Sequence, residues 1–197
     1  MVSTPADPPI RPAATLILWR NDATVLMGER ARGAVFMPGA YVFPGGAIED
    51  SDAADAIDQN TVERLGARSS LDPGAIVGAA LRELEEETGL APKPDAAKWI
   101  RYVMRAITPP GRTRRFDAYI LAAKAEMVVD VQALPEGDGE LGGIRWVGKD
   151  ARRDFKLAFP TRLALEEIDA LAPEIEQPER VPFLYPEADG QNRIEHI

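Results

Sequence analysis

The segment Arg82-Glu83-Leu84-Glu85-Glu86-Glu87-Thr88-Gly89-Leu90 crowds acidic side chains onto one helix and ends that helix at a glycine. At about 100° per residue, Glu83, Glu86 and Glu87 fall within an arc of about 100°. The neighbouring arc is apolar and predicts burial of the helix against a sheet; it carries Val77, Ala80, Leu81 and Leu84. The three carboxylates therefore lie where the core meets solvent.

Stability alone does not favour this crowding, because like charges at helix spacing cost about 0.2–0.5 kcal/mol per pair. Divalent cations that prefer oxygen ligands do favour it, so we predict that Glu83, Glu86 and Glu87 bind metal. The same geometry turns Glu85 towards solvent. The alternative is a plain solvated acidic face in which Arg82 and Glu86 form an i, i+4 ion pair.

The segment resembles the second half of the signature of the Nudix hydrolases, G-x5-E-x7-R-E-U-x-E-E-x-G-U with U aliphatic. That half is complete here, in Arg82, Glu83, Leu84, Glu86, Glu87, Gly89 and Leu90. The first half resembles Phe43-Pro44-Gly45-Gly46-Ala47-Ile48-Glu49, with Gly46 as the opening glycine. The resemblance covers about residues 13–147. It implies an α/β protein with the Nudix fold, a mixed β-sheet sandwiched between α-helices.

The two halves are further apart than in the family pattern. Gly46 and Arg82 are 36 positions apart, where the uninterrupted pattern needs 14, so 22 extra residues intervene. The position eight residues before Arg82, normally glutamate, is Gly74. The carboxylate partner of the motif arginine is thus open among Asp50, Asp52 and Asp72.

Three features of the chain resemble one branch of the family, the coenzyme A diphosphatases. The first is the interrupted signature, and the others are the segments 36–46 (Phe-Met-Pro-Gly-Ala-Tyr-Val-Phe-Pro-Gly-Gly) and Arg114-Arg115-Phe116-Asp117. The resemblance implies metal-dependent hydrolysis of a diphosphate in a nucleoside diphosphate derivative, with coenzyme A or acyl-coenzyme A as the preferred substrate. ADP-ribose, NADH and nucleoside triphosphates are the alternatives. So is a Nudix-fold sensor that binds a nucleotide without cleaving it.

The resemblance also implies roles for residues around the helix. The Gly45 carbonyl assists in binding Mg²⁺ or Mn²⁺, while Gly46, Arg82 and Gly89 have structural roles. A glutamate from the loop that carries Glu136, Asp138 and Glu140 completes the site, and Glu140 is the first choice because it lies nearest the following strand. The general base is open among Glu86, Glu87 and Glu140.

Three arginines, Arg112, Arg114 and Arg115, surround a predicted hairpin turn. Such arginines are mostly solvated edge charges, but guanidinium groups also bind phosphate oxygens in pairs. If the substrate is coenzyme A, its 3′-phosphate needs such a partner. We expect Arg115 first, then Arg114, to bind substrate.

Composition narrows the functional classes. Lys and Arg total 23 against 32 Asp and Glu, and the net charge of −9 argues against binding to nucleic acid. The absence of cysteine excludes disulfides and thiolate chemistry. No stretch approaches about 18 apolar residues, so we expect no membrane association and a cytoplasmic location. The expected partner is a small nucleotide-type molecule.

Periodicity and turn residues predict alternating strands and helices. Strands are expected at 14–20, 24–30, 40–43, 98–107, 114–123 and 142–147, and helices at 52–65, 75–88, 150–155 and 161–171. Residues 44–46 are expected to form a turn. We predict an irregular lead-in over 1–12, a Nudix domain over 13–172 with an insertion at about 52–73, and a C-terminal extension over 173–197. That extension is proline-rich, and we expect it to be largely extended and available to pack on a second subunit in a homodimer.

Overall fold

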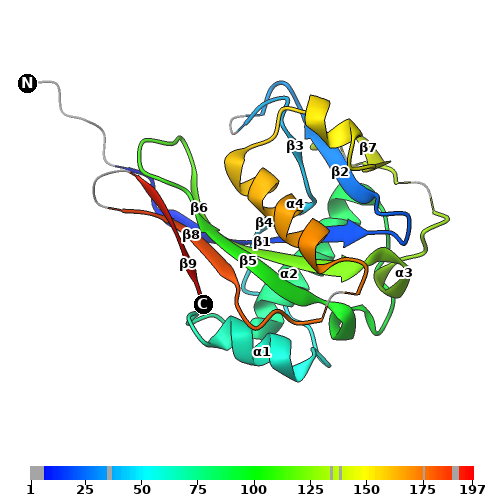
Figure 1. The fold of residues 1–197 in the computed structure, drawn as a ribbon, viewed down its shortest axis with the longest axis horizontal. Helices are drawn as coiled ribbons and strands as arrows, with labels where there is room; N and C mark the ends of the chain where they lie inside the picture. The colour runs from blue at the N-terminus through cyan, green and yellow to red at the C-terminus, as the bar shows by residue number, and fades with distance from the viewer. Residues whose placement is uncertain (1–6, 35–36, 134, 138, 175, 188–190) are drawn as a thin grey trace, which may run out of the picture.

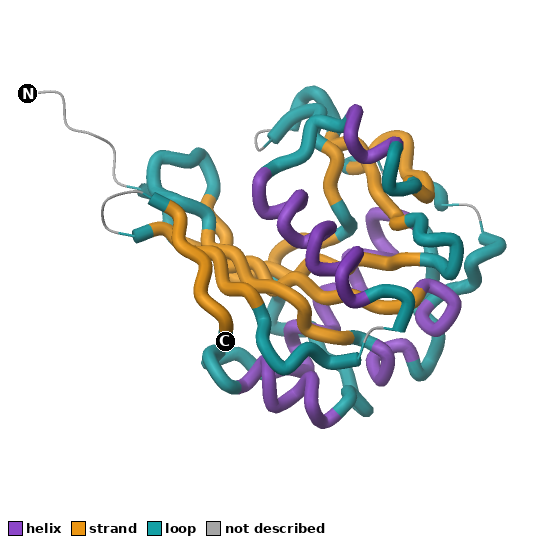
Figure 2. Tube along the Cα trace, viewed as in Figure 1, coloured by secondary structure: helices purple, strands orange, loops and turns teal. Residues whose placement is uncertain are grey.

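The computed structural model describes residues 7–34, 37–133, 135–137, 139–174, 176–187 and 191–197. A mixed β-sheet runs through the molecule and is covered by helices on both faces (Figures 1 and 2). The predicted α/β sandwich is confirmed.

The sheet has the strand order β3-β2-β1-β6-β5-β8-β9 through the described residues, with β4 paired to β1 and β7 paired to β2. β1 is parallel to β6 and β5 is parallel to β8, whereas the other neighbours are antiparallel. The strands are β1 (Ile10–Trp19), β2 (Val25–Arg30), β3 (Tyr41–Val42), β4 (Gly45–Ala47), β5 (Arg101–Ile107), β6 (Arg115–Lys124), β7 (Leu141–Val147), β8 (Pro182–Pro186) and β9 (Asn192–His196).

Strand β1 is buried on both of its faces because helices cover both sides of the sheet. Leu16 and Leu18 point into one apolar core, together with residues of α2. Ile17 and Trp19 point into the second core, together with residues of α4. The continuous apolar run of β1 is typical of such a central strand.

The helices divide between the two faces. They are α1 (Gln59–Gly66), α2 (Pro73–Thr88), α3 (Ala125–Val128) and α4 (Phe159–Leu171), with 3₁₀ turns η1 (Ala96–Trp99) and η2 (Ala151–Asp154). α1 and α2 pack on the first core and α4 on the second, in front of the sheet in Figure 1. The helix expected at 150–155 is therefore a single 3₁₀ turn.

Helix α2 begins and ends where its sequence indicates. The Asp72 side chain accepts a hydrogen bond from the Gly74 N–H, and Pro73 occupies the first turn. Gly89 adopts the left-handed conformation, with φ of 68°, and ends the helix. The acidic face of α2 is thus held in a defined rotation against the sheet.

The insertion is less helical than expected, since α1 starts only at Gln59. Its first part runs as irregular chain across α2. A Cβ atom on Gly78 of α2 would lie 2.5 Å from the backbone nitrogen of Ala53, so the two backbones approach closely. The insertion is therefore packed onto the helix that carries the acidic segment.

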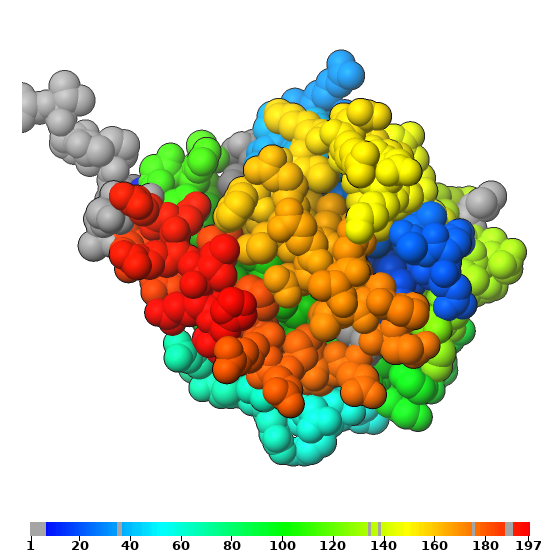
Figure 3. Space-filling view, viewed as in Figure 1, coloured from blue at the N-terminus to red at the C-terminus, as the bar shows by residue number. Residues whose placement is uncertain are grey.

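The C-terminal extension differs most from expectation. Instead of remaining free for a second subunit, residues 182–186 pair with β5 and residues 192–196 pair with β8. Val181 and Leu184 are buried in the two cores. Figure 3 shows the C-terminal residues (red) lying against the rest of the chain between the 108–114 hairpin, α1 and α4. A homodimer stays a prediction.

Two smaller boundaries also differ. β1 begins at Ile10, inside the expected lead-in, because residues 10–12 pair with β6. Residues 45–47 form strand β4 against β1, rather than only a turn. None of the helices in the described ranges combines the length and apolar character needed to cross a membrane.

Candidate active site

Arg82 is the centre of the hydrogen-bond network on the acidic face of α2. Its Nε and Nη2 atoms donate to the two carboxylate oxygens of Asp52, at 2.8 and 3.1 Å. Its Nη2 also donates to the Ala47 carbonyl at 3.0 Å, and its Nη1 donates to Glu83 and Glu86, each at 2.8 Å. Arg82 therefore joins the insertion, strand β4 and its own helix.

Asp52 is the carboxylate partner that the sequence left open. Its side chain is only 3% exposed and also accepts a hydrogen bond from the Glu49 N–H at 2.7 Å. The bond from Arg82 is the main reason that the pKa of Asp52 lies below its ordinary value. Asp50 is exposed and Asp72 caps α2, so the interrupted box restores its missing acid from within the insertion.

Glu83 lies directly over Gly46 in strand β4. A Cβ atom at position 46 would collide with the Glu83 carboxylate, so any other residue there would have to displace that side chain. Burial is the main cause that raises the pKa of Glu83, and the charges of Glu86 and Glu140 add to it. The Glu83 carboxylate is thus partly removed from water and lies beside the backbone of Gly46, which has no side chain.

Glu87 is the most buried acid of the segment, with 3% exposure. One of its carboxylate oxygens accepts a hydrogen bond from the Gly45 N–H at 2.9 Å. Burial nevertheless raises the pKa of Glu87 to about 7, and the neighbouring Glu83 charge adds to this effect. A carboxyl group of this kind carries its negative charge at low cost only beside a cation.

The donor set around Gly45 and Gly46 suits Mg²⁺ or Mn²⁺, because it consists of oxygen ligands and contains no sulfur or imidazole. Glu86 is 55% exposed at the mouth of the site, and Glu85 points to solvent as predicted. Within the residues that the structure describes, no three acidic or histidine side chains form a ready-made metal cluster. Arg82 donates to both Glu83 and Glu86, while Glu87 accepts from the Gly45 amide, so all three acids have hydrogen-bond partners.

These acids line one end of a large cleft. The cavity is about 960 Å³, and its walls come from β1, β4, β6, α2 and the start of α4. Glu140, in the loop before β7, lines the same cleft. Burial is the main cause that raises the pKa of Glu83 and of Glu87, and the negative charge of Glu140 raises both pKa values further. Glu136 instead donates its N–H to the Thr88 carbonyl behind α2, and Asp138 lies outside the described residues.

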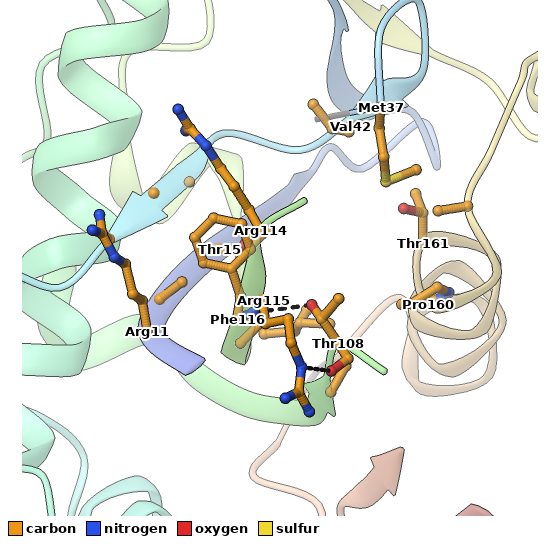
Figure 4. A pocket seen from close by; sticks show the side chains of 18 of the residues that line it. Arg11, Thr15, Met37, Val42, Thr108, Arg114, Arg115, Phe116, Pro160 and Thr161 are labelled. Atoms are coloured by element: carbon orange, nitrogen blue, oxygen red, sulfur yellow. Dashed lines mark hydrogen bonds between the residues drawn. The ribbon is translucent and has the colours of Figure 1, made fainter. Parts of the chain in front are cut away.

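The hairpin arginines also line the cleft, and Figure 4 shows Arg114 and Arg115. The Arg115 Nε atom donates to the Thr108 carbonyl at 3.1 Å, and its Nη1 lies 3.9 Å from Asp7. Arg115 is therefore largely engaged in holding the hairpin, whereas Arg114 extends in the opposite direction in Figure 4. Their binding of substrate stays a prediction.

Two further arginines of the cleft were not expected from the sequence. Arg30, at the end of β2, lies close enough for its charge to oppose the effect of burial on Glu87, and its Nε atom is buried without a hydrogen-bond partner among the described residues. Arg11 lies in the part of β1 that was assigned to the irregular lead-in. Neither belongs to a motif; only a correct start for β1 could have indicated Arg11.

No protein-family profile matches the chain, and no curated protein does either. Solved structures do match. A Nudix hydrolase from Alicyclobacillus acidocaldarius superposes with a TM-score of 0.61 and 25% identity, covering 82% of this chain and 91% of that one. A MutT Nudix hydrolase from Burkholderia pseudomallei gives 0.56 and 20% identity, covering 82% of this chain and 99% of that one.

A third similar structure is the Nudix domain of NrtR from Shewanella oneidensis, solved with ADP ribose. Its TM-score is 0.57 at 14% identity, and the match covers 84% of this chain and 90% of that chain. At this identity the likeness concerns the fold. Together with the Alicyclobacillus match, it shows that this chain has the Nudix fold.

Proposed function

We propose that the chain hydrolyses the diphosphate linkage of a nucleoside diphosphate derivative with the help of Mg²⁺ or Mn²⁺, and that coenzyme A or acyl-coenzyme A is its preferred substrate. One observation carries the proposal. Glu83, Glu86 and Glu87 line a cleft of about 960 Å³ beside the bare backbone of Gly45 and Gly46.

Glu83, Glu86, Glu87 and the Gly45 carbonyl are the groups that would hold the cation. When bound there, a divalent cation neutralises the diphosphate and makes water more acidic. Arg82 keeps Glu83 and Glu86 in place from behind, and Asp52 keeps Arg82 in place. Because Gly46 has no side chain, no atom from position 46 crowds the Glu83 carboxylate.

Hydrolysis joins a water oxygen to one phosphorus and breaks the bond from that phosphorus to the bridging oxygen. The bridging oxygen leaves with the electron pair on the second phosphate. A carboxylate of the chain takes the proton from the water, and Glu86, Glu87 and Glu140 are the candidates since all three line the cleft. For coenzyme A the products are 4′-phosphopantetheine and adenosine 3′,5′-bisphosphate.

Two features of the cleft support a substrate of this size. The cavity lies near the upper end of the about 300–1,000 Å³ that small-molecule and cofactor pockets span, which leaves room for a dinucleotide-type molecule. Beyond the acids, its walls are apolar near Phe43, Phe159 and Leu184 and basic near the hairpin. An uncharged arm and an additional anionic group could thus be accommodated at separate places.

A substrate panel tests the proposal: coenzyme A, acetyl-coenzyme A, ADP-ribose, NADH and a nucleoside triphosphate, each with Mg²⁺ and detection of the phosphate product. We expect coenzyme A to give the highest kcat/KM. Glu86→Gln and Glu87→Gln should keep the fold but lose about 10²-fold or more of the turnover. Glu85→Gln, on the solvent side of the same helix, is the matched control and should retain it. Near-native turnover in both active-site variants would disprove the assignment.

The second candidate is a nucleotide sensor without catalysis, and the NrtR domain solved with ADP ribose is the observation that favours it. In this chain Asp52 replaces the acid missing at position 74, which supports the enzyme instead. Calorimetric binding of ADP-ribose with no product at saturating Mn²⁺ would favour the sensor.

A further inference from the structure

Strand register distinguishes the arginines that line the cleft. Along β1 the residues on the cleft side are Arg11, Ala13 and Thr15, because successive side chains alternate between the two faces. Arg11 pairs with Phe116 of β6, so Phe116 lies on the same side of the sheet.

Arg114 immediately precedes β6 and lines the same cleft, whereas Arg115 pairs with Ile10 and takes the opposite parity from Arg11. Figure 4 agrees with this register. In that view the Arg11 and Arg114 side chains extend towards the same side, and Arg115 extends the other way, to Thr108.

Arg11 and Arg114 are also chemically available. Neither makes a hydrogen bond or ion pair with any residue that the structure describes, and both line the cleft. This contrasts with Arg82, Arg105 and Arg115, whose guanidinium groups all have carboxylate or carbonyl partners. Two unpaired guanidiniums on one wall of a cleft attract a doubly charged oxyanion, since guanidinium binds phosphate oxygens in pairs.

The distance between the two ends of the cleft restricts what this anion can be. Gly45, beside the acidic end, pairs with Thr15 of β1. Arg11 is four residues further along that strand, which is about 13 Å at 3.3 Å per residue. A clamp based at that distance along the strand can hold a second phosphate of a molecule whose diphosphate lies at the acidic end.

We propose that Arg11 and Arg114 form a clamp that selects substrates carrying a phosphomonoester in addition to the diphosphate. This deepens the proposed function, on which it rests for the position of the diphosphate. It assigns specificity to Arg11, and to Arg114 rather than to Arg115.

The test measures binding, so that it does not depend on turnover. Calorimetry with Mg²⁺ compares adenosine 3′,5′-bisphosphate, adenosine 2′,5′-bisphosphate and adenosine 5′-monophosphate. We expect one bisphosphate to bind at least about tenfold more tightly than the monophosphate, as one charge-assisted contact provides. Which isomer binds more tightly shows which ribose hydroxyl carries the phosphate.

The double variant Arg11→Gln/Arg114→Gln should lose this preference and bind all three nucleotides alike. Arg153→Gln, which removes a 77% exposed arginine on η2, is the control for net charge and should keep it. Equal affinities in the wild type, or a preference that survives in the double variant, would overturn the clamp. If the variant loses its circular dichroism spectrum, the single variants with the same comparison replace it.

Turnover then separates the clamp from the proposed function. Wild-type kcat/KM should be at least about tenfold higher for coenzyme A than for 3′-dephospho-coenzyme A, mostly through KM. The double variant should cleave the two compounds equally, at the wild-type rate for the dephosphorylated one. Equal wild-type rates on both compounds would overturn the clamp but not the diphosphatase, whereas a bisphosphate preference without hydrolysis of any compound would overturn only the diphosphatase.

Discussion

Replacing Asp52 by asparagine tests whether the insertion supplies the carboxylate partner of Arg82. The change removes a charge that is 3% exposed and accepts two hydrogen bonds from a guanidinium that is 23% exposed. Loss of one member of a buried pair costs about 3–5 kcal/mol. Arg82 keeps its bonds to Ala47, Glu83 and Glu86, so we expect a loss of about 2–3 kcal/mol of unfolding free energy.

A chain of this length shifts in Tm by about 2–4 °C per kcal/mol, so Tm should fall by about 4–12 °C. The assay is urea and thermal unfolding of wild type, Asp52→Asn and Asp50→Asn. Asp50→Asn removes an exposed acid two residues away and should change stability by no more than about 0.5 kcal/mol. The activity of Asp52→Asn should fall too. Without its Asp52 partner Arg82 can shift, and the Glu83 and Glu86 carboxylates that accept its hydrogen bonds shift with it.

The effect also has a defined pH dependence. The bond from Arg82 holds the pKa of Asp52 below its ordinary value of 3.8. A depressed folded-state pKa gives stability that is present above pH 3.8 and is lost as the pH falls through the lower folded value. The gap between wild type and Asp52→Asn should therefore be complete at pH 7 and narrow below about pH 3.8. Asp52→Asn as stable as Asp50→Asn at pH 7 would refute the reasoning.

Two further predictions concern the site and the C-terminal segment. Gly46→Ala places a Cβ atom against the Glu83 carboxylate, so Mg²⁺-dependent turnover should fall at least about tenfold; Gly33→Ala, whose Cβ meets nothing within 4 Å, should leave it unchanged. The Gln177 side chain accepts from the Tyr102 N–H at 2.9 Å and donates to the Tyr102 carbonyl at 2.8 Å. Gln177→Ala should therefore cost about 1–3 kcal/mol in urea unfolding and speed amide exchange at Tyr102; unchanged exchange there would show that the segment is not held through this contact.

The sequence predicted those helices and strands that are specified by residues close together in the chain. The apolar arc of α2, its Asp72 cap and the left-handed Gly89 all follow from neighbouring side chains, and the helix is found as expected. The alternating and apolar runs predicted β2, β5, β6 and β7 to within a few residues. The acidic face of α2 could be read in the same way, since helix geometry alone gathers Glu83, Glu86 and Glu87.

The sequence pattern predicted strands less well where a segment becomes a strand by pairing with a distant part of the chain. Residues 10–12 contain a proline and look irregular, but they form a strand because β6 lies beside them. The C-terminal segment looked available for a second subunit, yet β5 offered it a parallel edge. Strand pairing depends on chain segments distant in sequence, and composition at either position says little about it.

The sequence by itself determined the chemistry at the acidic end of the cleft: which carboxylates share a helix face, where that helix stops, and that a glycine pair accompanies them. Only the tertiary structure decided that Asp52 holds Arg82 and that Arg11 and Arg114 share a wall. Side chains three or four residues apart on a helix meet through covalent geometry alone. Pairs such as Asp52 with Arg82 and Arg11 with Phe116, which are 30 and 105 positions apart, come together only through insertion, sheet register and core packing.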